Sequence, residues 1–239
     1  MIDLHTHILP GLDDGARTPR EALEIARNAV ADGVTTVAAT PHVRSDYPNT
    51  WRQIEWALSL LRPDLTAAGV QLDVLAGAEV ALDILWEVPR GDLARLTLAQ
   101  TGRYLLLEFP YRGFPMAVET AVGELGRRGV TVVLAHPERN PEVQDRPASI
   151  ERLVDAGALV QVTAGSVDGR LGAAARIAAW HLLERSLVHL IATDSHGPNI
   201  REGGMRSAAE ALGDEELARR LTVDVPAAIA AGEAVPAVG

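Results

Sequence analysis

Short apolar runs alternate with amphipathic segments along the whole chain, and this alternation limits the fold more than any other feature. The runs predict about seven strands, at residues 1–6, 34–40, 70–79, 103–109, 130–136, 158–163 and 187–194. Continuous apolar strands that are separated by helices indicate a parallel sheet buried on both faces. The sequence therefore predicts an α/β fold, with a closed or nearly closed TIM-like barrel as first choice and a doubly wound open sheet as the alternative.

The segments between the runs carry helix signals. Thr18-Pro19-Arg20-Glu21 supplies an N-cap, a proline at the first helical position and a capping-box glutamate, and Gly33 predicts the end of that helix. Pro63 predicts a kink or a break in a helix that begins near Thr50. Further helices are expected at residues 118–125, 148–156, 172–185 and 204–221.

The length of the chain fits one domain. A span of 239 residues is normal for a single α/β barrel, and no linker or internal repeat divides it. We therefore expect a single domain over residues 1–239. The tail after about Pro226 is rich in alanine, proline and glycine and is expected to be poorly ordered.

The chain contains no cysteine and no lysine, so all 22 basic residues are arginine. The missing cysteine excludes disulfides, a thiolate zinc site and a cysteine-nucleophile phosphatase. The missing lysine excludes a Schiff-base enzyme, a P-loop and a carbamylated lysine that bridges two metals. Any group that binds phosphate here must use arginine, which suits a bidentate grip.

Charge and hydropathy indicate where the protein works. The net charge is −10 and the arginines are scattered, so no nucleic-acid partner is expected. The N-terminal sequence MIDLHTHILPG lacks the basic and apolar regions of a signal peptide. No apolar run reaches the roughly 18 residues of a membrane span. These features favour the cytoplasm and no membrane contact, and they leave the oligomeric state open.

Histidines and carboxylates occur at the C-terminal ends of the predicted strands or just beyond them. The nine candidates are His5, His7, Asp14, His42, Glu79, Glu108, His136, Asp194 and His196. In a parallel barrel these strand ends meet on one face, where active sites lie. His5 and His7 are two residues apart on a strand, so both imidazoles point to the same side and can bind one ion. The pattern predicts a metal centre.

The mixture of ligand types indicates which metals fit. Imidazole nitrogens with carboxylate oxygens suit manganese, iron, zinc or cobalt, and magnesium less well. Four carboxylates can offset about four positive charges, so at least two ions are expected, with Glu79 as a bridge near the centre. Sites with several metals suit phosphoryl transfer, because the ions lower the pKa of a bound water and neutralise developing charge.

Four arginines lie in loops that follow predicted strands: Arg17, Arg44, Arg139 and Arg201. Arg139 follows His136 in the motif HPER, and Arg201 follows the last DSH motif, so these two are the best candidates to bind phosphate and act in catalysis. Glu138 and Asp46 are possible proton donors, and the sequence does not choose between them.

The motifs together resemble a known family. MIDLHTHILPGLDDG, TPH at 40–42, GAE at 77–79, LLLEFP, LAHPER and ATDSH, in this order, are similar to the PHP (polymerase and histidinol phosphatase) superfamily. More narrowly, they resemble the bacterial manganese-dependent protein-tyrosine phosphatases of the CpsB/YwqE type. The resemblance runs from Met1 to about Ile229 and implies a distorted seven-stranded (β/α) barrel, the PHP fold.

The resemblance also implies a site and a substrate. It assigns three ions, most often manganese, to the sets His5, His7, Glu79 and Asp194; Glu79, Glu108 and His136; and Asp14, His42 and His196. Arg139 and Arg201 match the family's phosphate contacts. The implied reaction is direct attack by a metal-activated hydroxide on phosphotyrosine of a cognate tyrosine kinase that controls capsule or exopolysaccharide synthesis. The chain has Val225-Pro226 where the family often has Asn-Pro, a difference that concerns local structure more than the ligands.

Other activities remain open at this point. Relatives hydrolyse histidinol phosphate and other small phosphate esters, so a small-molecule phosphatase is the alternative within the same fold. An amidohydrolase also begins with HxH on its first strand, but the missing lysine and the extra ligands Asp14, His42 and Glu108 argue against it. The acidic balance disfavours a metal-dependent nuclease. A regulatory module on an inactive barrel should have lost ligands, and all nine are present.

Overall fold

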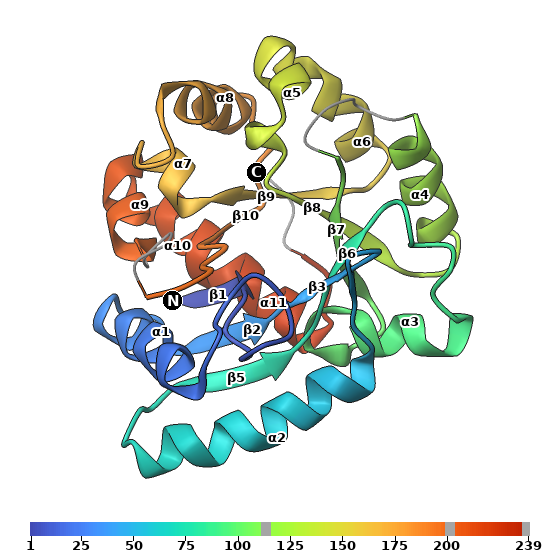
Figure 1. Cartoon of the computed structure of the whole chain (residues 1–239). Coiled ribbons are helices and arrows are strands. Elements are labelled where there is room, and N and C mark those ends of the chain that lie inside the picture. Colours follow the sequence, from blue (N-terminus) through green and yellow to red (C-terminus); the bar gives the residue numbers. More distant parts are fainter. Residues whose placement is uncertain (111–115, 199–203, 236–239) are drawn as a thin grey trace.

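The computed structural model describes residues 1–110, 116–198 and 204–235, in which strands and helices alternate. The strands are β1 (Ile2–Thr6), β2 (Thr36–Ala39), β3 (His42–Arg44), β4 (Tyr47–Pro48), β5 (Asp73–Ala76), β6 (Glu79–Ala81), β7 (Tyr104–Glu108), β8 (Thr131–Ala135), β9 (Leu159–Thr163) and β10 (Leu190–Ala192). The helices are α1 (Pro19–Ala31), α2 (Trp51–Ala67), α3 (Arg90–Leu96), α4 (Ala117–Gly126), α5 (Pro141–Asp145), α6 (Glu151–Asp155), α7 (Ala164–Val167), α8 (Ala173–Glu184), α9 (Met205–Leu212), α10 (Glu215–Arg219) and α11 (Val225–Ala231). Short helical turns are η1 (Leu98–Gln100), η2 (Pro137–Arg139), η3 (Pro147–Ile150) and η4 (Arg220–Asp224). Most helices lie outside the strands, which occupy the middle of the molecule (Figure 1).

The strands form two sheets. One has the order β1-β2-β5 and the other the order β10-β9-β8-β7-β6-β3-β4, and every pair except the antiparallel β3–β4 hairpin is parallel. The predicted α/β class is confirmed. The described strand order gives sheets of three and seven strands, and it does not by itself establish a single seven-stranded barrel.

The predicted strand at 70–79 is interrupted. It ends at Ala76, and Glu79 begins β6 instead of ending a strand. Gly77 lies in the gap, where a Cβ atom would come within 3.3 Å of Thr40 and 3.4 Å of Leu98. The sequence boundary was wrong because the chain leaves one sheet and enters the other in the middle of a continuous apolar run.

Backbone hydrogen bonds join β1 to the segment that follows β10. The amide of His7 donates to the carbonyl of Ser195 at 2.9 Å, and the amide of Asp194 donates to the carbonyl of His5 at 2.9 Å. Thr6 and Ser195 form an isolated parallel bridge. The first strand and the chain after the last strand therefore lie side by side, which brings the HTH and DSH motifs together.

The structure agrees with only part of the helix boundaries that the sequence predicts. Thr18 caps α1, and its side chain accepts a hydrogen bond from the Glu21 amide at 3.2 Å. α2 continues through Pro63, so the predicted break is wrong. The buried stripe of α2 consists of Ile54, Ala57, Leu58, Leu61 and Leu65. Burial of this stripe outweighs the hydrogen bond that proline removes.

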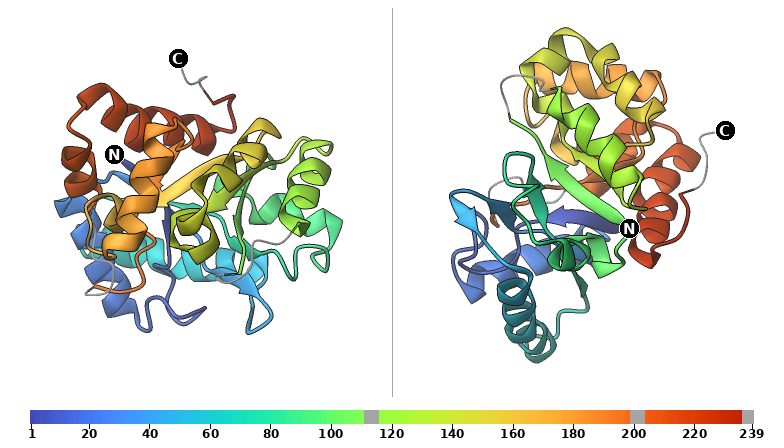
Figure 2. Two further views of the ribbon diagram at one scale, coloured as in Figure 1. Left: turned by 90° about the horizontal axis from the view of Figure 1, so that it is seen from above. Right: turned by 90° about the vertical axis from the view of Figure 1, so that its right-hand side faces the viewer.

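Apolar side chains pack in two layers around the strands. The inner cluster contains Leu4, Ala38, Leu98, Tyr104, Leu106, Val133, Ala135, Leu190, Val225 and Ile229. The outer cluster lies between the strands and the surrounding helices. Val225 and Ile229 come from α11, so the predicted disorder after Pro226 is wrong for this helix. Figure 2 shows the C-terminal helices next to the start of β1. No helix in the described part of the chain is long and apolar enough to cross a membrane.

Candidate metal centre

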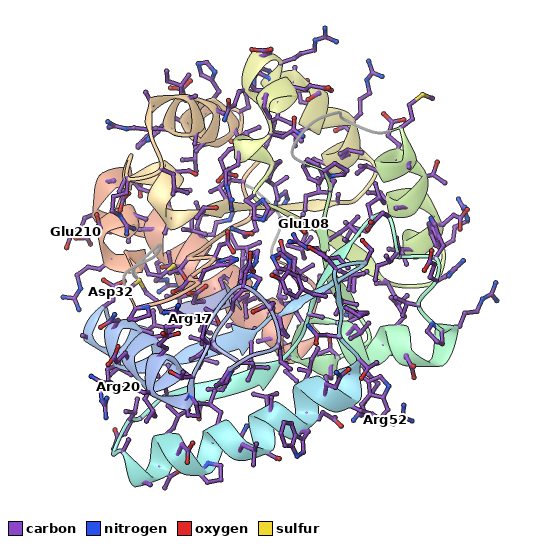
Figure 3. The ribbon with its side chains drawn as sticks, in the orientation of Figure 1. Arg17, Arg20, Asp32, Arg52, Glu108 and Glu210 are labelled. Carbon is purple, nitrogen blue, oxygen red and sulfur yellow. The ribbon has the colours of Figure 1, made fainter. Side chains whose placement is uncertain are left out.

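The structure brings all nine predicted ligand candidates together. Three overlapping groups have ligand atoms within 4.8 Å of one another: His7, Asp14, His42 and His196; His5, Glu79, His136 and Asp194; and His42, Glu79 and Glu108. Figure 3 shows the labelled Glu108 near the middle of the molecule, whereas Arg20 and Arg52 point outward from α1 and α2. Residues from β1, β3, β6, β7 and the segments after β1, β8 and β10 thus share one cluster, which is buried except at Asp14 and His196. Ligation by these residues remains a prediction.

Two histidines at the end of β1 occupy the centre of the cluster, His5 within the strand and His7 directly after it. His5 Nε2 and His7 Nε2 lie 3.2 Å apart. Glu79 Oε2 is 3.2 Å from His5 Nε2 and 3.4 Å from His7 Nε2, and Asp194 Oδ1 is 3.2 and 3.3 Å from the same two atoms. These four side chains are the set that the resemblance assigns to one ion.

Glu79 connects this set to its neighbours. Its Oε1 lies 3.0 Å from His136 Nε2, and its Oε2 lies 3.0 Å from His42 Nδ1. His42 Nδ1 is also 3.5 Å from Glu108 Oε2. The carboxylate of Glu79 therefore contacts histidines on both sides, as expected for a bridging ligand.

The remaining candidates lie at the more open end of the cluster. Asp14 Oδ1 is 3.5 Å from His42 Nε2 and 3.4 Å from His196 Nε2. The rings of His7 and His196 stack with centroids 3.9 Å apart. Because of this stacking, the geometry groups His7 with the third expected set as well as the first, so the three sets form one continuous cluster.

Strained backbone presents two of these side chains. His136 has φ 37° and Asp194 has φ 52°, in the left-handed region that non-glycine residues rarely adopt. Both residues follow parallel strands at the point where the chain turns away. Strain of this kind costs on the order of 1–3 kcal/mol per residue and is concentrated at functional sites.

Charges inside the cluster depend strongly on one another. Burial would raise the pKa of Glu79, but the charge of His5 and the close contacts with His136, His42 and His5 lower it well below its usual range. Burial would lower the pKa of His136, yet the hydrogen bond and charge of Glu79 raise it to about 9. Burial and the charge of Glu79 raise the pKa of Glu108. The carboxylates of Glu79 and Glu108 are therefore both ionised at low cost only when positive charge lies beside them.

The donor set fits divalent cations. Glu79 Oε2 and His42 Nδ1 lie 3.0 Å apart, and both atoms are buried without a hydrogen-bond partner among the described residues. Buried polar atoms in native proteins usually have a partner. A metal ion between nitrogen and oxygen ligands satisfies such atoms, and this mixture suits manganese, iron, zinc or cobalt.

The sequence did not identify two side chains that contact the Nδ1 atoms of His7 and His5. Asp13 Oδ2 lies 2.7 Å from His7 Nδ1, and Gln161 Oε1 lies 2.9 Å from His5 Nδ1. Asp13 is next to the predicted ligand Asp14, and nothing in the sequence separates their roles. Gln161 did leave a signal, because it is a polar residue inside the apolar strand LVQVT.

Arg139 is the phosphate-binding candidate that the structure places at the cluster. It follows His136 in η2, is largely buried and forms an ion pair with Asp194 Oδ2. Its predicted partner in phosphate binding, Arg201, lies outside the described residues. The catalytic role of both arginines remains a prediction.

The other two arginine candidates differ in position. Arg44 Nη1 lies 3.5 Å from Glu108 Oε2, and its guanidinium lies over the Tyr47 ring, so it stands beside the cluster. Arg17 is 82% exposed and pairs with Glu21 on the surface of α1. Arg17 is therefore not among the residues that surround the cluster.

The two suggested proton donors are held by other groups. Glu138 is buried, and its Oε1 accepts hydrogen bonds from the Thr163 amide at 2.9 Å and from the Ser166 hydroxyl at 2.7 Å. It fastens the start of α7 to η2. Asp46 is exposed and pairs with Arg44 at 2.7 Å. Neither carboxylate belongs to the three groups of candidate ligands that the structure brings together.

Comparison with known proteins identifies the family. Residues 1–230 match the family model described as capsular polysaccharide synthesis, CpsB/CapC. The chain belongs to this CpsB/CapC family. It is 37% identical over 219 residues to the tyrosine-protein phosphatase YwqE of Bacillus subtilis, covering 90% of this chain and 85% of that protein. It is 31% identical to the putative tyrosine-protein phosphatase CapC of Staphylococcus aureus, covering 82% and 77%.

A solved structure of this family matches the fold of the chain. The chain superposes with a TM-score of 0.91 and 34% identity on a structure from work on YwqE of Bacillus subtilis and CpsB of Streptococcus pneumoniae, described as unique metal-dependent tyrosine phosphatases. The match covers 99% of this chain and 96% of that one. The resemblance to CpsB/YwqE-type proteins that the motifs indicated is thus confirmed.

Proposed function

We propose that the chain is a metal-dependent tyrosine-protein phosphatase of capsule or exopolysaccharide synthesis. The observation that carries this proposal is the continuous cluster of nine histidines and carboxylates with Arg139 paired at its edge. Family relatives named tyrosine-protein phosphatases support it. The sequence has no cysteine, so hydrolysis proceeds without a cysteinyl phosphoenzyme.

The cluster is proposed to hold three ions, with manganese as the expected metal. One ion binds to His5, His7, Glu79 and Asp194, a second to Glu79, Glu108 and His136, and a third to Asp14, His42 and His196. When bound, the ions supply Lewis acidity that lowers the pKa of a water molecule and neutralises charge on the phosphate. Glu79 links the first two sets through its separate oxygens, which lie beside His5 and His136.

Arginine side chains are proposed to orient the substrate. Arg139 is held next to the cluster by its pair with Asp194, and its guanidinium can donate to two phosphate oxygens at once. Arg201 is proposed to share this role. Because Asp194 already fixes the Arg139 side chain, little conformational freedom is lost when phosphate binds.

The proposals for the fold, the substrate and the location are consistent with this activity. The two sheets are proposed to act as one distorted seven-stranded barrel, joined through β1 and the segment after β10, within a single domain over residues 1–239. The proposed substrate is a phosphotyrosine segment of a cognate bacterial tyrosine kinase. The proposed location is the cytoplasm, with no nucleic-acid or membrane partner.

Phosphate release by metal-stripped protein tests the function directly. Manganese is added back, and a phosphotyrosine peptide and histidinol phosphate are compared as parallel substrates, with Glu79→Gln as the inactive control. Manganese-dependent activity with a higher kcat/KM on the peptide is the expected result. Activity on histidinol phosphate alone would move the protein to small-molecule metabolism, and absence of activity on both would contradict the proposal.

A further inference from the structure

The two histidines at the end of β1, His5 in the strand and His7 directly after it, present the same nitrogen to the cluster. The Nε2 atoms of His5 and His7 lie 3.2 Å apart and within 3.4 Å of Glu79 Oε2 and Asp194 Oδ1. Each ring has its Nδ1 turned away from the cluster, toward a different buried side chain. For Nε2 to bind a metal it must carry no proton, so the Nδ1 atom must hold it.

Asp13 accepts hydrogen bonds from three directions. Its Oδ2 lies 2.7 Å from His7 Nδ1 and accepts from the His42 amide at 2.9 Å, and its Oδ1 accepts from the Gly15 amide at 2.9 Å. The Asp13 side chain is fully buried. One carboxylate therefore ties the end of β1, the following loop and the start of β3 together.

Only a carboxylate satisfies this arrangement. The amides of His42 and Gly15 present one N–H group to each oxygen of Asp13, so both oxygens must accept. An asparagine has one accepting and one donating end, so one orientation would place its NH₂ group against Gly15 and the other against His7 and His42. Gly15 permits this close approach of its amide, because a Cβ atom there would lie 2.2 Å from the His7 carbonyl oxygen and 2.9 Å from Asp13 Oδ1.

Gln161 holds His5 in a similar way with a neutral group. Its side chain is fully buried on β9, and Oε1 lies 2.9 Å from His5 Nδ1. Its Nε2 is buried without a hydrogen-bond partner among the described residues. A half-satisfied amide in a strand interior is unfavourable for stability, so its presence indicates that the bond to His5 matters.

We propose that Asp13 and Gln161 are positioning residues that hold the protons of His7 and His5 on Nδ1 and so keep both Nε2 atoms available to a metal ion. This inference rests on the proposed function, because it assigns the two side chains to the metal centre of the phosphatase. Partners of this kind orient metal-binding histidines and raise their basicity.

Metal binding in the absence of substrate tests the inference. Mn²⁺ is titrated into metal-stripped protein in competition with a chromophoric chelator, and the number of bound ions and their Kd values are compared. Asp13→Asn is expected to weaken binding on the order of 10–100-fold. Asp64→Asn, an exposed aspartate of α2, is the matched control and should bind as wild type.

Two variants of Gln161 distinguish the effect of its hydrogen bond to His5 from the effect of its packing. Gln161→Met keeps the volume but removes the acceptor, and it should weaken Mn²⁺ binding on the order of 10-fold or more. Gln161→Glu keeps an acceptor at the same place and should retain Mn²⁺ binding. Circular dichroism of the metal-free proteins checks folding, and the Gln161 pair decides the matter if Asp13→Asn does not fold.

The outcomes distinguish the inference from the proposed function. Wild-type Mn²⁺ affinity in folded Asp13→Asn or in Gln161→Met would overturn the positioning role, as would equal losses in Gln161→Met and Gln161→Glu. A wild-type protein that binds Mn²⁺ but does not release phosphate from phosphotyrosine contradicts the proposed function instead, while the affinities of the variants still decide the roles of Asp13 and Gln161.

Discussion

Arg139 is ion-paired with Oδ2 of Asp194, the carboxylate whose Oδ1 lies 3.2 Å from His5 Nε2. One carboxylate therefore faces a phosphate-binding candidate on one side and a ligand candidate on the other. The pair holds the guanidinium in place before any substrate arrives. A phosphate that binds to this guanidinium lies directly beside the cluster.

Removal of Arg139 should therefore affect catalysis strongly. We expect Arg139→Ala to reduce kcat/KM for a phosphotyrosine peptide by about 30- to 1,000-fold, which corresponds to about 2–4 kcal/mol, because a bidentate contact to the phosphate is lost. Arg17→Ala is the control, since Arg17 is 82% exposed and pairs only locally among the described residues. Steady-state kinetics measures both, and equal values for the two variants would rule out Arg139 as the phosphate contact.

Loss of a predicted ligand should reduce metal content as well as turnover. Glu108→Gln removes a group beside His42 and His136→Ala a group beside Glu79, and both should abolish phosphate release while the fold persists. Elemental analysis of the purified proteins should show fewer bound ions than in wild type. The exposed Glu119→Gln on α4 serves as control. Near-wild-type activity in either ligand variant would show that the residue does not serve the metal site.

Removal of the metals should destabilise the whole domain. Buried carboxylates lose their counterions, and binding to the folded state alone stabilises by about 3 kcal/mol when free metal is at 100 times Kd. For a domain of this size the expected rise in Tm when Mn²⁺ is restored is about 5–10 °C. Differential scanning calorimetry with and without Mn²⁺ measures it, and Glu79→Gln should show a smaller rise. An unchanged Tm after Mn²⁺ is added would contradict the proposal that the cluster binds metal.

Most of the framework could be predicted from the sequence because its strands are buried on both faces. Runs such as YLLLE and TVVLA stand out as continuous apolar segments. The two- and three-residue strands β4, β3 and β6 are too short to show any periodicity. α11 was missed because buried helices lack a polar face, and its alanines and proline suggested a loose tail instead.

The candidate ligands could be found because histidines and acids at the ends of buried strands are chemically conspicuous. Asp13 and Gln161 could not be assigned in this way. Gln161 approaches His5 across 156 positions of sequence, and only the three-dimensional arrangement of β1 and β9 reveals the contact. Asp13 and Asp14 are adjacent, and the turn of the loop alone decides which of them faces His7.

A histidine away from the metal cluster should make stability depend on pH. His189 is buried, and burial lowers its pKa from 6.5 to about 4. As pH falls below 6.5 the unfolded chain gains a proton that the folded protein does not, so stability present above pH 6.5 is lost toward pH 4. The loss amounts to about 2–3 kcal/mol at pH 4.5. Urea unfolding of metal-free protein at pH 7.5 and 4.5 should show a loss of stability that is about 2–3 kcal/mol larger in wild type than in His189→Gln.

The C-terminal helix should be essential to the inner core. Ile229 is fully buried among side chains of the strands, so Ile229→Ala should reduce the free energy of unfolding by about 2–5 kcal/mol. Leu60→Ala on α2 is the control, because Leu60 is about half exposed and should change stability by less than about 0.5 kcal/mol. Chemical denaturation measures both values, and a small effect at Ile229 would mean that α11 does not support the strands.

The hydrogen bonds between β1 and the segment after β10 have a consequence for biosynthesis. His5 and His7 leave the ribosome long before Asp194 and His196, so β1 gains these neighbours only when the later segment has been made. Contacts between distant parts of a chain form slowly. A nascent chain thus lacks a complete set of candidate ligands until the segment after β10 has been made, and loading of the full metal centre must follow that step.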